Sequence, residues 1–307
     1  MNLVGIGECM VELSDDGGGR YRQGFAGDVF NSCYYHAALA PTAATTFVSA
    51  LGDDPFSAML TERCETLGIR LECARLAGAT LGLYLIGVDA AGERRFTYWR
   101  SAAPARRLIA ALTPGQRATI ESAQLLLVSG ITLAILDTAQ RETLLGLLDA
   151  VRRRGGRVVF DPNYRPALWE NVDAARHWID ACYRLSDVAL PGLDDERALF
   201  GATDLNEVLA RETIARIPEV VVKAGAEGAV GRLHDDNFRV VATPATRVVD
   251  TTAAGDAFNG AYLAARGQGV AAAAAAAHAG RVAAAVIAQR GAIVPIDLLL
   301  QPEIDVE

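Results

Sequence analysis

Short apolar segments alternate with longer segments of helical pattern along most of this 307-residue chain, and this alternation limits the fold more than any other feature. Residues 45–50, 125–129, 158–161, 188–190 and 220–223 each have the composition of a buried strand. Strands that are buried on both faces and joined by helices form βαβ units. The sequence therefore predicts an α/β fold with a central, mostly parallel sheet and helices on both faces.

Between these strands the sequence predicts helices, which begin at capping residues or prolines and end at glycines or prolines. One helix is expected to follow the strand at 125–129 and to continue to Arg154. Short antiparallel strands are expected across residues 229–250. A short helix is expected to start at Thr113-Pro114, and the other expected helices cover residues 28–40, 55–67, 173–182, 194–200, 205–217, 255–266 and 270–289.

Two polar hairpins do not fit the core of such a sheet. One lies near residues 10–25, and the other spans residues 81–98 and turns at 89–92. We interpret them as a small separate sheet that covers the core as a lid. The expected organisation is one domain over residues 1–307, with lid segments near 10–25 and 81–100.

Charge and composition exclude several classes of function. The formal net charge of −8 argues against a general nucleic-acid binder, which carries a basic surplus. No stretch of ~20 residues is both apolar and free of charge, so no membrane-spanning helix is expected. The five cysteines form no CxxC pair, which is typical of reduced thiols, and the N-terminus lacks the basic start of a signal peptide. We therefore expect a cytoplasmic protein with no nucleic-acid or membrane partner.

The segment VDTTAAGDAFNG, residues 249–260, carries the strongest chemical signal. A strand is expected to end at Asp250 and a helix to begin near Gly255, with small residues between them. Such a turn lets backbone N–H groups surround an anion at the positive end of the helix. Asp256 would lie beside that anion, where a carboxylate can accept the proton of an attacking hydroxyl. An Asp in a first turn also stabilises ordinary helices, so the spacing alone leaves both interpretations open.

The stretch DTTAAGDAF closely resembles DTxGAGDxF, the second signature of the PfkB (ribokinase-like) carbohydrate kinases. The resemblance implies a ribokinase-like fold and phosphoryl transfer from ATP, with Mg²⁺, to a sugar hydroxyl. It identifies Asp256 as the catalytic base. Ala253 stands where the family has a glycine, and a side chain there is costly if the position needs a positive φ. The implied catalytic set is Asp256, Gly255, Ala254 and Ala253, whose backbone N–H groups form the anion hole.

Other segments extend the resemblance over essentially the full length. Gly27, Asp28 and Asn31 match the family's substrate loop, in which Asp and Asn bind sugar hydroxyls; an N-cap at Asp28 is the alternative. The pattern at 223–228 matches the K-x-G-x-x-G nucleotide loop, for which a plain hairpin turn is the alternative. The ATP contacts that the resemblance implies are Asn163, Arg165, Lys223, Gly225, Glu227, Gly228, Ala254 and Gly255.

The metal-binding residues of the family have a partial counterpart. Asp195 and Glu196 occupy the place of the family's NxxE motif, which helps to hold magnesium through water. The asparagine of that motif is missing in this chain. Asp195 and Glu196 are therefore the two candidates for the metal.

Three further segments resemble the branch of the family that acts on 2-keto-3-deoxygluconate: GECMVEL at 7–13, the YWR triplet at 98–100, and DPNYRPALW at 161–169. The resemblance implies that Tyr84, Tyr98, Arg100 and Arg165 surround a sugar acid, together with Gly27, Asp28, Asn31 and Asp256. A sugar acid needs a fixed cation for its carboxylate, and the planar fork of arginine binds a carboxylate bidentately. The alternatives are a rim position for Arg100 and a loop salt bridge for Arg165.

The resemblance therefore implies an ATP- and Mg²⁺-dependent kinase that phosphorylates the 6-hydroxyl of 2-keto-3-deoxygluconate. It also implies a homo-oligomer that pairs through the β lid. Two alternatives remain open from the sequence. One is a fructokinase- or ribokinase-type enzyme on a neutral sugar, and the other is a non-catalytic sugar-binding regulator, which only Ala253 favours.

Overall fold

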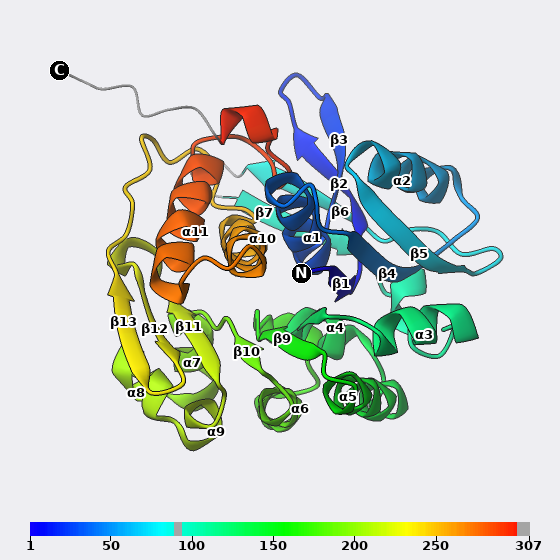
Figure 1. Ribbon diagram of the computed structural model, residues 1–307. Helices are drawn as coiled ribbons and strands as arrows, with labels where there is room; N and C mark the ends of the chain where they lie inside the picture. The colour runs from blue at the N-terminus through cyan, green and yellow to red at the C-terminus, as the bar shows by residue number, and fades with distance from the viewer. Residues whose placement is uncertain (89–93, 300–307) are drawn as a thin grey trace.

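The computed structural model describes residues 1–88 and 94–299, and its larger sheet has the strand order β13-β12-β11-β10-β9-β8-β1-β4-β5 (Figure 1). Neighbouring strands are parallel from β11 through to β5, and the β11–β12 and β12–β13 pairings are antiparallel. This confirms the expected α/β fold. The strands are β1 (Leu3–Ile6), β4 (Thr45–Leu51), β5 (Ile69–Arg75), β8 (Leu125–Ser129), β9 (Arg157–Asp161), β10 (Val188–Ala189), β11 (Glu219–Lys223), β12 (Ala229–Leu233) and β13 (Asp236–Val240).

Helices cover both faces of this sheet because its strands are apolar on both sides (Figure 1). In β8, Leu126 and Val128 belong to one buried cluster, and Leu125 and Leu127 belong to the other. Among the described residues, no helix is long and apolar enough to cross a membrane. One face carries α1 (Asp28–Leu39), α2 (Pro55–Thr66), α10 (Ala254–Gly267) and α11 (Ala272–Ile287). The other carries α3 (Pro114–Glu121), α4 (Gly130–Ile135), α5 (Thr138–Arg153), α6 (Val172–Arg184), α7 (Leu193–Phe200), α8 (Leu205–Ala210) and α9 (Glu212–Ala215).

Some local expectations were wrong. The helix expected to run to Arg154 is two helices, because the side chain of Asp137 accepts a hydrogen bond from the Gln140 N–H and starts α5 anew. The helix expected over 205–217 is likewise split into α8 and α9. Residues 241–250 form no strand, although the structure describes all of them, and instead Val249 and Asp250 donate to the Ile287 carbonyl.

The edge strand β5 was not expected from the sequence. Only Ile69 and Ala74 of this strand are buried, so its composition lacks the continuous apolar run of the central strands. Four single-turn 3-10 helices also occur in the described chain, namely η1 (Pro104–Arg107), η2 (Pro166–Leu168), η3 (Gly225–Glu227) and η4 (Ile296–Leu298).

The two polar hairpins do form a separate small sheet, in the order β3-β2-β6-β7. Its strands are β2 (Met10–Asp15), β3 (Tyr21–Ala26), β6 (Leu83–Val88) and β7 (Arg94–Trp99). β2 pairs in parallel with β6, and the two outer pairings are antiparallel. The turn expected at 89–92 lies outside the described residues.

The connections of the small sheet place it over the carboxyl ends of the large sheet. The chain passes directly from β1 into β2, and β3 leads directly into α1. At the second junction Gly27 packs against the backbone, since a Cβ there would lie 2.0 Å from the Glu8 carbonyl oxygen. Ligands of open α/β sheets bind outside the carboxyl ends of the strands. The small sheet therefore roofs the region where a binding cleft is expected.

Candidate active site

The turn before α10 has the form that an anion hole requires. Ala253 is the N-cap of α10 and has φ 60° and ψ 11°, so it adopts the left-handed conformation that favours glycine. No side chain caps the first N–H groups of the helix. The positive end of α10 is thus left for an external anion. Because φ at position 253 is positive, the alanine side chain there costs conformational free energy, as the sequence led us to expect.

Asp256 lies in the first turn of α10 and is half-buried. The Asn31 side chain donates a hydrogen bond from Nδ2 to Asp256 Oδ2 at 2.8 Å. Burial raises the pKa of Asp256 to about 7, and the charge of Asp28 adds to that effect while the Asn31 hydrogen bond opposes it. A carboxyl with a pKa near neutrality can exchange a proton with a hydroxyl that it faces.

Asp28 and Asn31 reach this site from α1. The N-cap of α1 is Gly27, so the alternative that Asp28 caps the helix was wrong. Asp28 is the first helical residue, and its Oδ2 accepts a hydrogen bond of 3.0 Å from Asn163 Nδ2. Asn163 has φ 30°, a strained value for a residue with a side chain. The starts of α1 and α10 and the loop after β9 therefore meet at one place, the region expected to hold ligands and called the cleft from here on.

Lys223 ends β11 and is held beside the start of α10. Its Nζ donates to Asp161 Oδ2 at 2.8 Å and to Asn259 Oδ1 at 3.0 Å. Asn259 Nδ2 also donates to Asp161 Oδ2, which closes a buried network of three side chains. A Cβ on Gly255 would lie 3.7 Å from Lys223 Nζ, so the ammonium group lies close to the helix start.

Sequence reasoning missed Asp161 and Asn259 as members of the site. Both were visible in quoted motifs, Asp161 at the end of an apolar strand and Asn259 three residues beyond Asp256. Residues three apart on a helix share a face, and that spacing could have identified Asn259.

The loop after Lys223 is the hairpin turn between β11 and β12, as the alternative interpretation expected. Gly225 and Gly228 have φ values of 51° and 88°. A Cβ on Gly228 would lie 2.1 Å from the Val240 carbonyl oxygen, so only glycine fits. Glu227 lies exposed on the same turn. A hairpin of this form leaves backbone close to the cleft, which is what a nucleotide loop also needs.

On the small sheet, the two tyrosines and Arg100 lie together. The rings of Tyr84 and Tyr98 are 5.7 Å apart, and the Arg100 guanidinium lies 5.8 Å from the centre of the Tyr98 ring. The Tyr84 hydroxyl donates to Glu12 Oε2, and Arg100 Nη2 forms an ion pair with Glu8 Oε2.

Arg100 therefore does not occupy a rim position, and that alternative was wrong. Its side chain is 11% exposed, and that of Glu8 is 2% exposed. Burial raises the pKa of Glu8, and Arg100 opposes that rise. The pair is close to neutral as a unit, so Arg100 offers N–H donors rather than a free positive charge. Glu8 and Glu12, the partners of the predicted residues, were not identified as site residues from the sequence.

Arg165 differs from Arg100 in its partners. It is exposed, its Nη1 donates to the Tyr164 carbonyl at 3.2 Å, and it forms no ion pair with a carboxylate in residues 1–88 or 94–299. The loop salt bridge proposed as its alternative is therefore not observed there. Its positive charge is felt by Asp195, whose pKa burial raises to about 6 while Arg165 and Lys223 oppose the rise.

The two candidates for the metal are separated by the structure. Asp195 feels the charges of Asp161, Arg165 and Lys223, which places it beside the cleft. Glu196 is fully buried elsewhere, where its carboxylate accepts from the Tyr183 hydroxyl at 2.6 Å and pairs with Arg211 Nε at 3.2 Å. The described residues contain no group of three or more His, Cys, Asp or Glu side chains placed to hold a metal ion.

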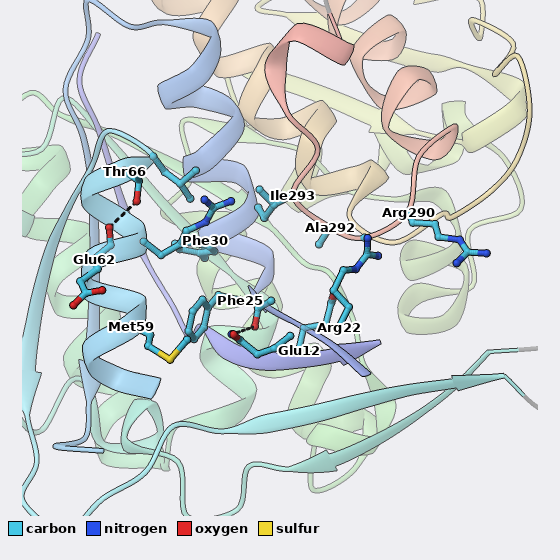
Figure 2. A pocket seen from close by; sticks show the side chains of 15 residues that line it. Glu12, Arg22, Phe25, Phe30, Met59, Glu62, Thr66, Arg290, Ala292 and Ile293 are labelled. Carbon is cyan, nitrogen blue, oxygen red and sulfur yellow. Dashed lines mark hydrogen bonds between the residues drawn. The ribbon is translucent and has the colours of Figure 1, made fainter. Parts of the chain in front are cut away.

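A separate pocket of about 490 Å³ lies between β3, α2 and residues 290–293. Figure 2 shows Phe25 and Met59 in its wall, with Glu12 and Ala292 at the side toward the small sheet. Within the described chain, none of the predicted site residues lines this pocket. Two of its lining residues also contact the site: Glu12 accepts the Tyr84 hydroxyl, and Ala292 packs in one cluster with Tyr84 and Ala253. This pocket is therefore not the place where the predicted catalytic residues meet.

Comparison with known proteins agrees with this geometry. Residues 2–298 match the description "pfkB family carbohydrate kinase". The chain belongs to the pfkB family of carbohydrate kinases. This kinase is 39% identical over 307 residues to the 2-dehydro-3-deoxygluconokinase of Dickeya dadantii (strain 3937), with 97% of this chain and 98% of that protein covered.

Solved structures have the same ribokinase-like fold. The PfkB protein from Polaromonas sp. JS666 superposes with a TM-score of 0.83 at 25% identity, covering 98% of this chain and 99% of that one. A candidate ribokinase II from Escherichia coli, in complex with ATP and Mg²⁺, gives a TM-score of 0.82 at 22% identity, covering 95% and 94%. The expected fold is thereby confirmed.

Replacing Asp256 by asparagine is expected to stabilise the kinase above pH 7. Burial raises the pKa of Asp256 from 3.8 to about 7, so the wild type loses stability as the pH rises between these values. The neutral amide escapes this loss, and its gain is about 1–2 kcal/mol because the cleft is partly open to solvent. Urea unfolding at pH 8 and pH 4 measures the difference. A variant no more stable than wild type at pH 8 would contradict the assigned burial.

Proposed function

We propose that this pfkB kinase transfers the γ-phosphoryl group of ATP to the 6-hydroxyl of 2-keto-3-deoxygluconate and forms 2-keto-3-deoxy-6-phosphogluconate. The observation that carries the proposal is the position of Asp256, a carboxyl of raised pKa at an uncapped helix start. The 39% identity to the 2-dehydro-3-deoxygluconokinase of Dickeya dadantii supports this choice of substrate. We also propose a cytoplasmic location, in keeping with five free cysteines.

In the proposed reaction the carboxylate of Asp256 accepts the proton of the acceptor hydroxyl. The hydroxyl oxygen forms a bond to the γ-phosphorus as the bond from that phosphorus to the β-phosphate oxygen breaks, and ADP leaves. Backbone N–H groups of residues 253–256 face the charge that develops on the transferred group. Asn31 holds the Asp256 side chain in place through its hydrogen bond.

The residues proposed to bind ATP fit a phosphate-bearing ligand. Lys223 brings a positive charge to the start of α10, and Gly228 occupies a place where any side chain would strike the backbone. The turn with Gly225 and Glu227 would lie along the nucleotide, with Asn163 nearer the phosphates, whereas Arg165 is assigned below to the sugar acid. Asp195 would help to hold Mg²⁺ through water, and the ion would supply positive charge that neutralises the phosphates. Glu196 is already engaged by Tyr183 and Arg211 and is not part of this proposal.

The choice of a sugar acid follows from the different partners of the two arginines. The charge of Arg100 is balanced by Glu8, whereas Arg165 keeps its charge exposed at the cleft. We assign Arg165 as the cation for the substrate carboxylate, and Arg100 and Tyr98 as donors to its oxygens. The Tyr84 hydroxyl, which donates its proton to Glu12, would accept from a sugar hydroxyl. A neutral sugar has no carboxylate, so it would not pair with the charge of Arg165.

The exchange Asp256→Asn is expected to lower kcat by about 10²–10⁴-fold, because the acceptor hydroxyl loses its general base. The kcat/KM of the wild type should rise with pH through about 7, since the ionised carboxylate is the active form. Release of ADP with 2-keto-3-deoxygluconate measures both. Asp194→Asn, an exposed neighbour of Asp195, is the matched control and should keep wild-type rates.

Two outcomes would contradict this part of the proposal. One is Asp256→Asn retaining more than a tenth of the wild-type kcat. The other is a wild type that binds sugars but releases no ADP with any of them, which would instead favour the non-catalytic regulator.

The exchange Arg165→Ala is expected to raise KM for the sugar acid about 10–100-fold, because a charge-assisted pair with the carboxylate is lost. The kcat/KM for fructose, a neutral sugar, should change less than twofold. Arg165→Lys keeps the charge without the planar fork and should fall between wild type and Arg165→Ala. Steady-state kinetics on both sugars measure this. Better use of fructose than of the acid by the wild type, unaffected by Arg165→Ala, would point to a neutral-sugar kinase.

We further propose that residues 1–307 work as one domain, that the small sheet is its lid, and that two copies pair through this sheet. Trp99 and Tyr21 are 58% and 52% exposed, and the strand register puts both on the same face of the sheet. Exposed aromatic side chains of this kind favour protein contacts.

The exchange Trp99→Asp is expected to convert the dimer into a monomer, because a charge would be buried in the contact. Light scattering during gel filtration measures the mass. His177→Asp, a helical surface change far from the sheet, should leave the mass at that of the wild type. A wild type that is already monomeric at micromolar concentration would contradict the pairing.

A further inference from the structure

Ala253 has a left-handed backbone and a methyl group that packs against a buried cluster, and the start of a helix requires neither. Its backbone is left-handed, with φ 60°, which an alanine adopts only at a cost in free energy. The only other non-glycine residues with positive φ in the described chain are Asn163 and His234. Such strain persists only where the surrounding structure holds it in place. The question is therefore what holds Ala253.

The surroundings of Ala253 answer this question. It packs against a small buried cluster, separate from the two large ones, that sits beneath the small sheet. The cluster contains Met10, Ala26, Tyr84 and Ile86 of the small sheet, and Ala292 of the following loop region. The methyl group is the whole side chain of Ala253, so a glycine would make no such side-chain contact.

We propose that Ala253 is a positioning residue that couples closure of the small sheet, the lid, to formation of the anion hole. This inference rests on the proposed kinase function. With the lid closed, the cluster holds the methyl group and keeps residue 253 left-handed, which directs the N–H groups of the following residues toward the phosphate. With the lid open, the contact is lost and the strained turn relaxes. The hole is then complete only when water is excluded.

In this coupling the backbone strain at Ala253 makes the anion hole depend on closure of the lid. A glycine would hold the left-handed conformation without help from the lid, so the hole would persist in the open protein. The open protein admits water to the γ-phosphoryl group. Ala253 thus limits wasteful transfer of phosphate to water, at the cost of a strained turn.

The test is the ratio of ADP released without sugar to ADP released with saturating sugar acid. Ala253→Gly is expected to raise this ratio about fivefold or more, because water transfer no longer requires the closed lid. It should also raise the sugar KM about fourfold, the factor that corresponds to the ~0.8 kcal/mol of one buried methyl-sized group. Ala253→Ser keeps a Cβ and should stay within twofold of wild type in both.

His234→Gly is the matched control for strain alone. His234 has φ 53° and lies exposed in the turn between β12 and β13. Its replacement should raise the unfolding temperature and leave the ratio unchanged. The same measurement on Ala253→Gly verifies that this variant is folded.

A lid-side variant tests the contact itself. Ile86→Ala should raise the sugar KM in the wild-type background and add little in the Ala253→Gly background, because both changes remove the same contact. An unchanged ratio and KM in Ala253→Gly would overturn the coupling, as would full additivity of the two changes. Wild type without any sugar-dependent ADP release would contradict the proposed function, and the coupling falls with it.

Discussion

Two carboxylates in one cleft, each held by an amide side chain, form the constraint on which the rest of this site depends. Asp28 and Asp256 lie in the first turns of two helices that are far apart in sequence, and Asn163 and Asn31 each donate a hydrogen bond to one of them. Burial and the charge of Asp28 raise the pKa of Asp256. The hydrogen bonds keep both carboxyls in place despite that repulsion. A base that ionises near neutral pH is the direct result.

The remaining charges of the cleft are arranged so that few are left unbalanced. Lys223 is tied to Asp161 and Asn259, and Arg100 is tied to Glu8, so these groups are rigid and nearly neutral as units. Arg165 stands apart with its charge exposed. In the proposed reaction a small anionic substrate would meet fixed donors and the exposed charge of Arg165, so that charge would select it more than shape.

The sequence predicted the fold because its signals are local, and local motifs also named the site residues on which the proposal depends. The α/β alternation and the turn around Asp256 are each contained in short segments. Long-range partners carry no such signal: Asn31 and Asp256 are 225 residues apart, and Glu8 and Arg100 are 92 apart. Edge strand β5 was missed because it is half-exposed, and Glu196 was misjudged because its buried partner Arg211 lies on another element. Pairings between distant segments need the fold itself.

The most direct test of the account is the identity of the product. Incubation of the purified protein with ATP, Mg²⁺ and 2-keto-3-deoxygluconate, followed by ³¹P NMR and mass spectrometry, shows where the phosphoryl group goes. The account predicts one new phosphomonoester, on the primary 6-hydroxyl, formed in equal amount to ADP. Only inorganic phosphate, or an ester formed on neutral sugars but not on the sugar acid, would contradict it.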